Sequence, residues 1–191
     1  MTMNLRLITP PSEDPISLEE AKAHLNVDAD ITEDDNLIRG LIAAAVQAAE
    51  HKIGRSLMPQ TWELTLDRFV PVITLDKPPI VQVKSVRYMD PDGVMQTLAS
   101  AAYLLDDFSE PGRLVPAPGM FWPETRCQLN AVRIQFEVGY EDAAKVPRAI
   151  KQWMLLQIGT MYANRESAVI GTIVAELPHV DGLLDRYKVW R

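Results

Sequence analysis

The hydrophobic period of this sequence changes twice, and this limits the folds that the chain can adopt. Apolar residues recur at helical spacing over residues 37–53, alternate with polar residues from residue 60, and return to helical spacing after Pro147. A period of 3.6 residues buries one face of a helix, whereas a period of two buries one face of a strand. The sequence therefore predicts an α+β protein, with a small helical bundle as its core and an inserted antiparallel β region.

This change of period also predicts the domain boundaries. We expect residues 1–58 and 144–191 to form the helical core, and residues 59–143 to form the inserted β subdomain. With 191 residues, of which 47% are hydrophobic, the chain is long enough to bury a core without disulfides.

Local signals place the ends of the helices. Ser17 followed by Glu20 has the pattern of a capping box, which predicts a short helix to about residue 25. Thr32 or Asp34 is expected to cap the helix over residues 37–53, and Gly54 to end it in a left-handed conformation. Two further apolar stripes predict a helix from Pro147 to residue 162 and a short helical stretch over residues 180–187.

Alternating residues mark the strands of the β region. The clearest alternation covers residues 132–140, and a second covers residues 60–67. Over residues 81–88 the alternation changes phase near Lys84 and Ser85, which predicts a β-bulge or a bend in the strand. Shorter strands are expected at residues 94–98, 103–105 and 113–115.

No set of residues in the sequence has the spacing of a catalytic, metal-binding or cofactor-binding site. The acidic residues 28–34 resemble a calcium-binding loop, but Glu33 stands where such a loop needs glycine and Arg39 where it needs glutamate. The three histidines are far apart, and Cys127 has no histidine near it in the sequence. We therefore expect no catalytic residue, no metal and no cofactor, and a protein that is not an enzyme.

Charge and composition exclude two further classes of protein. The chain has 19 Lys and Arg against 26 Asp and Glu, a net charge of −7, which argues against a protein that coats DNA. No apolar run approaches the roughly 18 residues of a membrane span, so no membrane partner is expected. The single cysteine and the polar N-terminus favour a reducing cytoplasm.

The C-terminal part contains apolar residues that a small domain has difficulty burying. They are Val169, Ile170, Ile173, Val174 and Trp190. These side chains either cover the core of their own domain or contact a neighbouring chain, and the sequence favours neither possibility. We treat them as candidate subunit-interface residues.

The β region has aromatic residues that allow an alternative function. Trp62, Tyr88, Tyr103 and Trp122 can line a binding site for a carbohydrate or another ligand, which would make the chain a non-enzymatic binding module on a helical scaffold. Packing in the core is the simpler explanation of these side chains, and the sequence favours it.

A series of short motifs resembles the head-tail connector proteins of long-tailed bacteriophages and prophages. In order these are PISLEEAKAHL (15–25), DNLI (35–38), GR (54–55), QTW (60–62), PPI (78–80), VKSVRY (83–88), WP (122–123), IQFEVGY (134–140), VPRAI (146–150) and YANR (162–165). Each motif has the character of a cap, a turn or a core stripe, and none has a catalytic role to transfer. Together they extend over nearly the whole chain.

This resemblance implies a structural protein of the virion. Members of the family form an oligomeric ring of roughly a dozen copies that binds the portal protein after DNA packaging and continues the DNA channel to the tail. The implied partners are other copies of the chain, the portal, a tail-completion or head-closure protein, and genomic DNA that passes without sequence-specific binding. The implied location is the bacterial cytoplasm during assembly and then the head-tail junction of the virion.

Overall fold

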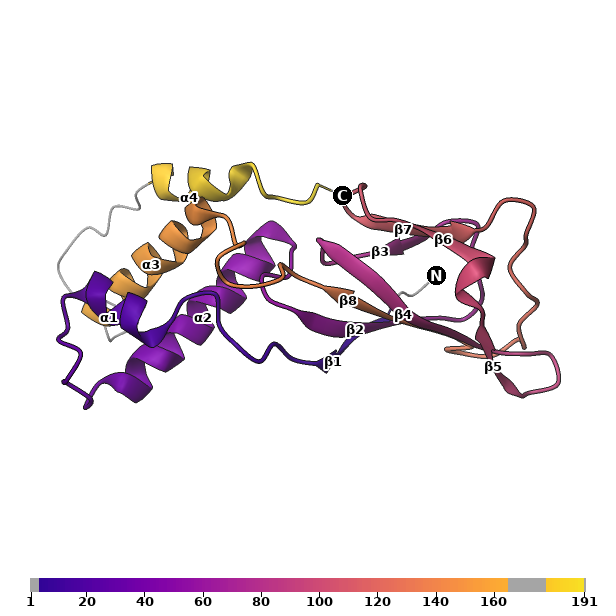
Figure 1. Ribbon diagram of the computed structural model, residues 1–191, viewed down its shortest axis with the longest axis horizontal. Coiled ribbons are helices and arrows are strands. Elements are labelled where there is room, and N and C mark those ends of the chain that lie inside the picture. The colour runs from indigo at the N-terminus through magenta and orange to yellow at the C-terminus, as the bar shows by residue number, and fades with distance from the viewer. Residues whose placement is uncertain (1–3, 165–177, 191) are drawn as a thin grey trace. The chain divides into compact units, whose positions relative to one another are not determined.

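The computed structural model describes residues 4–164 and 178–190, and these residues form an α+β fold, as predicted (Figure 1). The chain divides into two compact units. A β unit consists of Met1–Ser12 and Pro59–Tyr140, and a helical unit consists of Glu13–Met58 and Glu141–Arg191.

The β unit contains all eight strands of the described residues and one 3₁₀ turn. They are β1 (Asn4–Thr9), β2 (Gln60–Leu66), β3 (Ile73–Leu75), β4 (Ile80–Met89), β5 (Met95–Leu98), η1 (Ser100–Ala102), β6 (Tyr103–Asp106), β7 (Gly112–Pro116) and β8 (Val132–Val138). A five-stranded sheet has the order β1-β2-β8-β4-β5, and a three-stranded sheet has the order β3-β7-β6. Every neighbouring pair of strands is antiparallel.

Residues of both sheets form one hydrophobic core, and Figure 1 shows the strands of the two sheets. The alternating residues of β8 point into it, so Ile134 and Phe136 are completely buried, and Leu66 of β2 lies beside them. From the second sheet, Ile73 and Leu114 complete the same buried cluster. The other face of the five-stranded sheet is polar, because a period of two assigns alternate residues to opposite faces. The irregularity expected near Lys84 and Ser85, a bulge or a bend, is confirmed by a shift of register between Val83 and Ser85.

Residues 4–12 belong to the β unit, which differs from the expectation that residues 1–58 form part of the helical core. Strand β1 pairs with β2 so that Leu5 lies opposite Leu64 and Leu7 opposite Trp62. The partner strand is more than fifty residues away in the sequence, so local periodicity does not reveal the pairing.

The helical unit is built from α1 (Leu18–Leu25), α2 (Asp35–Ile53), α3 (Arg148–Ala163) and α4 (Pro178–Asp185). Helix α3 packs against α1, α2 and α4. The contact face of α2 combines large residues such as Ile38 and Ile42 with Ala45 and Ala49, and the small alanines let a neighbouring helix approach closely. Opposite it, α3 buries its own apolar stripe of Ile150, Trp153, Met154 and Ile158.

Two of the predicted helix ends are confirmed, and one cap differs. The Ser17 hydroxyl accepts a hydrogen bond from the Glu20 amide at 3.1 Å, and Gly54 ends α2 with a φ of 71°. Asp34 stands at the N-terminal cap of α2, but its carboxylate makes no capping hydrogen bond and instead accepts one from the Tyr162 hydroxyl. The side chain therefore holds α3 against the start of α2 instead of capping the helix.

Candidate assembly surfaces

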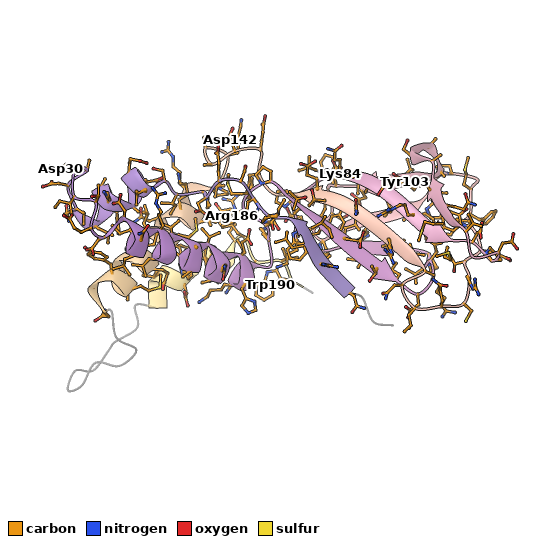
Figure 2. All side chains as sticks on the ribbon, turned by 90° about the horizontal axis from the view of Figure 1, so that it is seen from below. Asp30, Lys84, Tyr103, Asp142, Arg186 and Trp190 are labelled. Carbon is orange, nitrogen blue, oxygen red and sulfur yellow. The ribbon has the colours of Figure 1, made fainter. Side chains whose placement is uncertain are left out.

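Residues 26–34, between α1 and α2, form a loop that we call the acidic loop, and it is organised around the ammonium group of Lys22. This side chain is only 6% exposed, lies 2.5 Å from Asp35, and donates to the Ile31 carbonyl at 2.6 Å and the Ala29 carbonyl at 3.3 Å. The buried ammonium group of Lys22 therefore holds the inner side of the loop in place. The loop carries Asp30 on its outer side, as Figure 2 shows.

Among residues 4–164 and 178–190, no group of three or more His, Cys, Asp or Glu side chains is arranged to hold a metal ion. In the same part of the chain, no helix combines the length and the apolar character needed to cross a membrane.

The charge of the chain is concentrated in one segment. Residues 13–39 contain nine acidic and two basic residues, a net charge of −7, so the other 164 residues carry seventeen of each sign. This segment comprises α1, the acidic loop and the first turn of α2. The whole net charge of the protein therefore lies at one part of the helical unit. In the sequence, the acidic loop and the net charge were considered as separate features. A count of charged residues segment by segment would have shown that the segment containing the loop carries the net charge.

Helix α4 is attached to α2 and α3 by one polar cluster. The Asp181 carboxylate accepts a hydrogen bond from Lys52 of α2 at 2.5 Å and one from the indole nitrogen of Trp153 at 3.0 Å. The Lys52 ammonium also lies 5.8 Å from the centre of the Trp153 ring. The hydrogen bond from Lys52, followed by that from Trp153, lowers the pKa of Asp181 below its ordinary value of 3.8.

Only one of the five candidate interface residues lies in the described part of the chain. Trp190 is 77% exposed, although the residues just before it are held in place. The Val189 amide donates to the Ile53 carbonyl at 2.9 Å, and the Tyr187 carbonyl accepts from Arg55 at 2.5 Å. Trp190 thus points outward from a segment of the chain that is held in place by hydrogen bonds. The other four candidates, Val169, Ile170, Ile173 and Val174, lie outside the described residues.

The aromatic residues that allowed a ligand-binding alternative pack on the core of the β unit. Trp62, Tyr88, Tyr103 and Trp122 are all partly buried against the hydrophobic cluster. Trp122 stacks on Phe69 with ring centroids 4.7 Å apart, and Tyr88 meets the same ring edge-on at 5.7 Å. Burial also raises the pKa of Tyr103 above its ordinary value of 10.0. Core packing therefore accounts for these side chains.

Two phenylalanines that sequence reasoning missed are almost fully exposed. Phe108, in the turn after β6, is 96% exposed, and Phe121, after β7, is 91% exposed. The turn that carries Phe108 is fixed by Asp106, whose carboxylate accepts hydrogen bonds from the Ser109 hydroxyl and from the amides of Ser109 and Phe108. These hydrogen bonds, the one from the Ser109 hydroxyl foremost, lower the pKa of Asp106. Large exposed aromatic side chains of this kind mark contact surfaces.

The polar face of the five-stranded sheet is rich in arginine, and we call it the outer face. Glu63 accepts a hydrogen bond from Gln135 at 2.9 Å and forms an ion pair with Arg87 at 3.5 Å. Glu137 lies 3.7 Å from the ammonium of Lys84. Arg6 and Arg133 share this face and are exposed.

Comparison with known proteins supports the resemblance seen in the motifs. Residues 15–88 match the sequence model of a family described as phage gp6-like head-tail connector protein. A comparison with curated proteins gave no match.

Solved structures of gene transfer agent (GTA) particles contain chains of the same fold. One chain from the neck of an empty GTA particle, computed with C6 symmetry, and one from the virion of a native GTA particle each give a TM-score of 0.79 at 22% identity, covering 98% of this chain and 96% of theirs. A chain from the neck of the native particle, computed with C12 symmetry, gives 0.74 at 23% identity over 100% of this chain and 97% of its own. The resemblance to head-tail connector proteins is thus confirmed by the family match over residues 15–88, and the GTA chains show where else this fold occurs.

Proposed function

We propose that this chain is a head-tail connector of a phage-like particle, in which identical copies form a ring beneath the portal and continue the DNA channel to the tail. The observation that carries this proposal is the combination of the family match over residues 15–88 with a fold shared over 98% of the chain with a neck protein of a GTA particle. The neck structures of those particles were computed with C6 and C12 symmetry, which supports a ring of roughly a dozen copies here.

The proposed role is structural and not enzymatic. The polar clusters of the described residues each join one element to another, as Lys22 joins α1 to the acidic loop and Asp181 joins α4 to α2 and α3. The chain acts through its shape and its contacts with other subunits. Its partners are other copies of itself, the portal, and the head-closure or tail-completion protein on the tail side.

The net charge of the chain suits passage of DNA. A ring of copies that each carry a charge of −7 repels phosphate groups instead of retaining them. Genomic DNA therefore passes the channel without sequence-specific binding. The protein assembles in the bacterial cytoplasm and remains at the head-tail junction of the virion.

The proposal is tested by deleting the gene from a functional phage or prophage that encodes this chain. We expect DNA-filled heads without joined tails, and recovery of complete particles when the chain is supplied from a plasmid. Recovery of normal numbers of tailed, filled particles from the deletion strain would overturn the proposal.

A further inference from the structure

We propose that the outer face of the five-stranded sheet is the docking surface for the acidic loop of a neighbouring copy of this chain. This inference rests on the proposed function, because it names the contact through which one copy in a ring binds the next.

The outer face carries more positive charge than its own carboxylates neutralise. Its two carboxylates are already engaged, Glu63 by Arg87 and Glu137 by Lys84. Arg6 and Arg133 remain, and neither forms an ion pair with any other described residue, although both are exposed. The face therefore has a surplus of two positive charges in a protein whose net charge is −7.

The register of the sheet places two of these arginines side by side. Arg87 of β4 lies directly opposite Arg133 of β8. Like charges at directly opposed positions destabilise a sheet pair. The Nε atom of Arg87 is also buried, without a hydrogen-bond partner in the described part of the chain. A carboxylate brought against this face relieves the repulsion, which identifies the chemistry of the partner as acidic.

The acidic loop of the same chain has the complementary charge. Asp28, Asp30 and Glu33 are exposed, and they belong to the segment that holds the entire net charge of the protein. Because Lys22 fixes the loop from within, little conformational entropy is lost when the loop docks. Since the loop and the arginines are exposed in one copy, the two surfaces are available to separate copies.

This contact is of the type that a ring requires. A closed ring is built from heterologous contacts, in which one surface of each copy meets a different surface of the next. A loop that meets a sheet face is such a contact, whereas a self-complementary patch makes a twofold dimer. DNA is the other polyanion that the arginines could bind, but the β unit that carries them has ten acidic and eight basic residues, a net charge of −2, which opposes it.

The test uses charge reversal on each side of the contact. The sheet variant is R6E with R133E, and the loop variant is D30K with E33K. All four positions are exposed, so folding should be retained, and a thermal melt checks this. The matched control is R148E, which reverses an exposed arginine at the start of α3 in the helical unit. The readout is the number of copies that bind to portal-bearing heads isolated from the deletion strain.

We expect each double variant to need a concentration at least about tenfold higher than wild type to half-saturate the heads, because a favourable contact becomes repulsive. An equal mixture of the two variants should restore binding to within roughly threefold of wild type. In a ring of both variants, contacts between an unchanged sheet face and an unchanged loop alternate with contacts in which the charges of both surfaces are reversed. R148E should bind like wild type, and added salt should weaken wild-type binding.

Failure of this inference differs from failure of the proposed function. If wild type never joins the heads, the function proposal falls. If wild type joins but both double variants join equally well, or if the mixture of variants shows no rescue, the docking inference is overturned while the function stands. If R6E with R133E abolishes retention of double-stranded DNA and leaves binding to heads intact, DNA is the occupant of the face and the inference is likewise overturned.

Discussion

At the scale of single residues, Lys22 shows how an acidic loop can be ordered from inside the protein. Its ammonium contacts the Asp35 carboxylate and two loop carbonyls, the same kinds of oxygen atom that a calcium ion takes as ligands. The charge that orders the loop thus comes from the chain itself. In the sequence, Glu33 and Arg39 argue against a calcium site in this loop. The role of Lys22 in ordering the loop could not be predicted, because Lys22 precedes the loop on α1 and its spacing from the loop matches no known motif.

Replacing Lys22 with methionine should lower the free energy of unfolding by about 3 kcal/mol, because the variant leaves Asp35 without its buried counter-charge. Chemical denaturation followed by circular dichroism measures this change. Lys145 is exposed, so the control K145M should change the free energy of unfolding by less than about 0.5 kcal/mol. An equal effect of both substitutions would contradict the role assigned to Lys22.

Asp181 makes a stability contribution that depends on pH. Its pKa in the folded protein lies below the ordinary value of 3.8, mainly because Lys52 and then Trp153 donate hydrogen bonds to the charged form. The contribution is therefore present above about pH 3.8 and is lost as the pH falls through the folded pKa. Asp181 is half exposed to water, so D181N should destabilise the protein by at most about 1 kcal/mol at pH 7.

The difference between wild type and D181N should shrink as the pH falls below the folded pKa. Denaturation curves at pH 7, 4 and 2.5 are the measurement. A difference that grows on acidification would show that the sign of this linkage is wrong.

At the scale of elements, one glycine lies inside helix α2 and a second follows its last residue, and the two are in opposite situations. Gly40 lies inside the helix with open space around it, whereas Gly54 ends the helix at a positive φ with Val189 nearby. Alanine at position 40 should stabilise the protein by up to about 1 kcal/mol, because alanine is the better helix former. Alanine at position 54 should destabilise it by about 1 kcal/mol, because a side chain is strained in that conformation. Thermal unfolding of G40A and G54A is the comparison, and shifts of the same sign would contradict it.

Most elements could be predicted from the sequence, including the short strands β5, β6 and β7, whereas β1 and β3 could not. The alternation over β8 and the apolar stripes of α2 and α3 appear within the residues of each element. Strand β1 has too few alternating residues before Pro10, and β3 has only three residues, so long-range pairing makes them strands.

The candidate assembly surfaces could not be predicted from the sequence either, because they depend on contacts between residues that are far apart in the chain. The irregularity in β4 was predicted, but its partner strand was not, so the sequence could not place Arg87 opposite Arg133. The exposure of Phe108 depends on the turn formed by Asp106 and Ser109. Of the predicted interface residues, the structure places only Trp190, on the surface, and the proposed contact of Val169, Ile170, Ile173 and Val174 with a neighbouring chain stays a prediction.

At the scale of the whole molecule, a substitution at the interface of a ring subunit should leave the folded monomer stable but reduce its assembly into particles. Trp190 is 77% exposed, so W190S should change the free energy of unfolding by less than about 0.5 kcal/mol. Loss of a large exposed aromatic side chain from an interface should still reduce the copies found per particle. Denaturation of the purified variant and quantification in purified particles check the two parts. Unchanged incorporation would remove Trp190 from the interface.

The most direct measurement is electron cryomicroscopy of the neck of particles that contain this chain, compared with heads from the deletion strain. Our account predicts a closed ring of density next to the portal that fits the β unit and the helical unit of each copy, and that is missing from the deletion heads. A neck with identical density in both samples, or density for this chain elsewhere in the particle, would contradict the account.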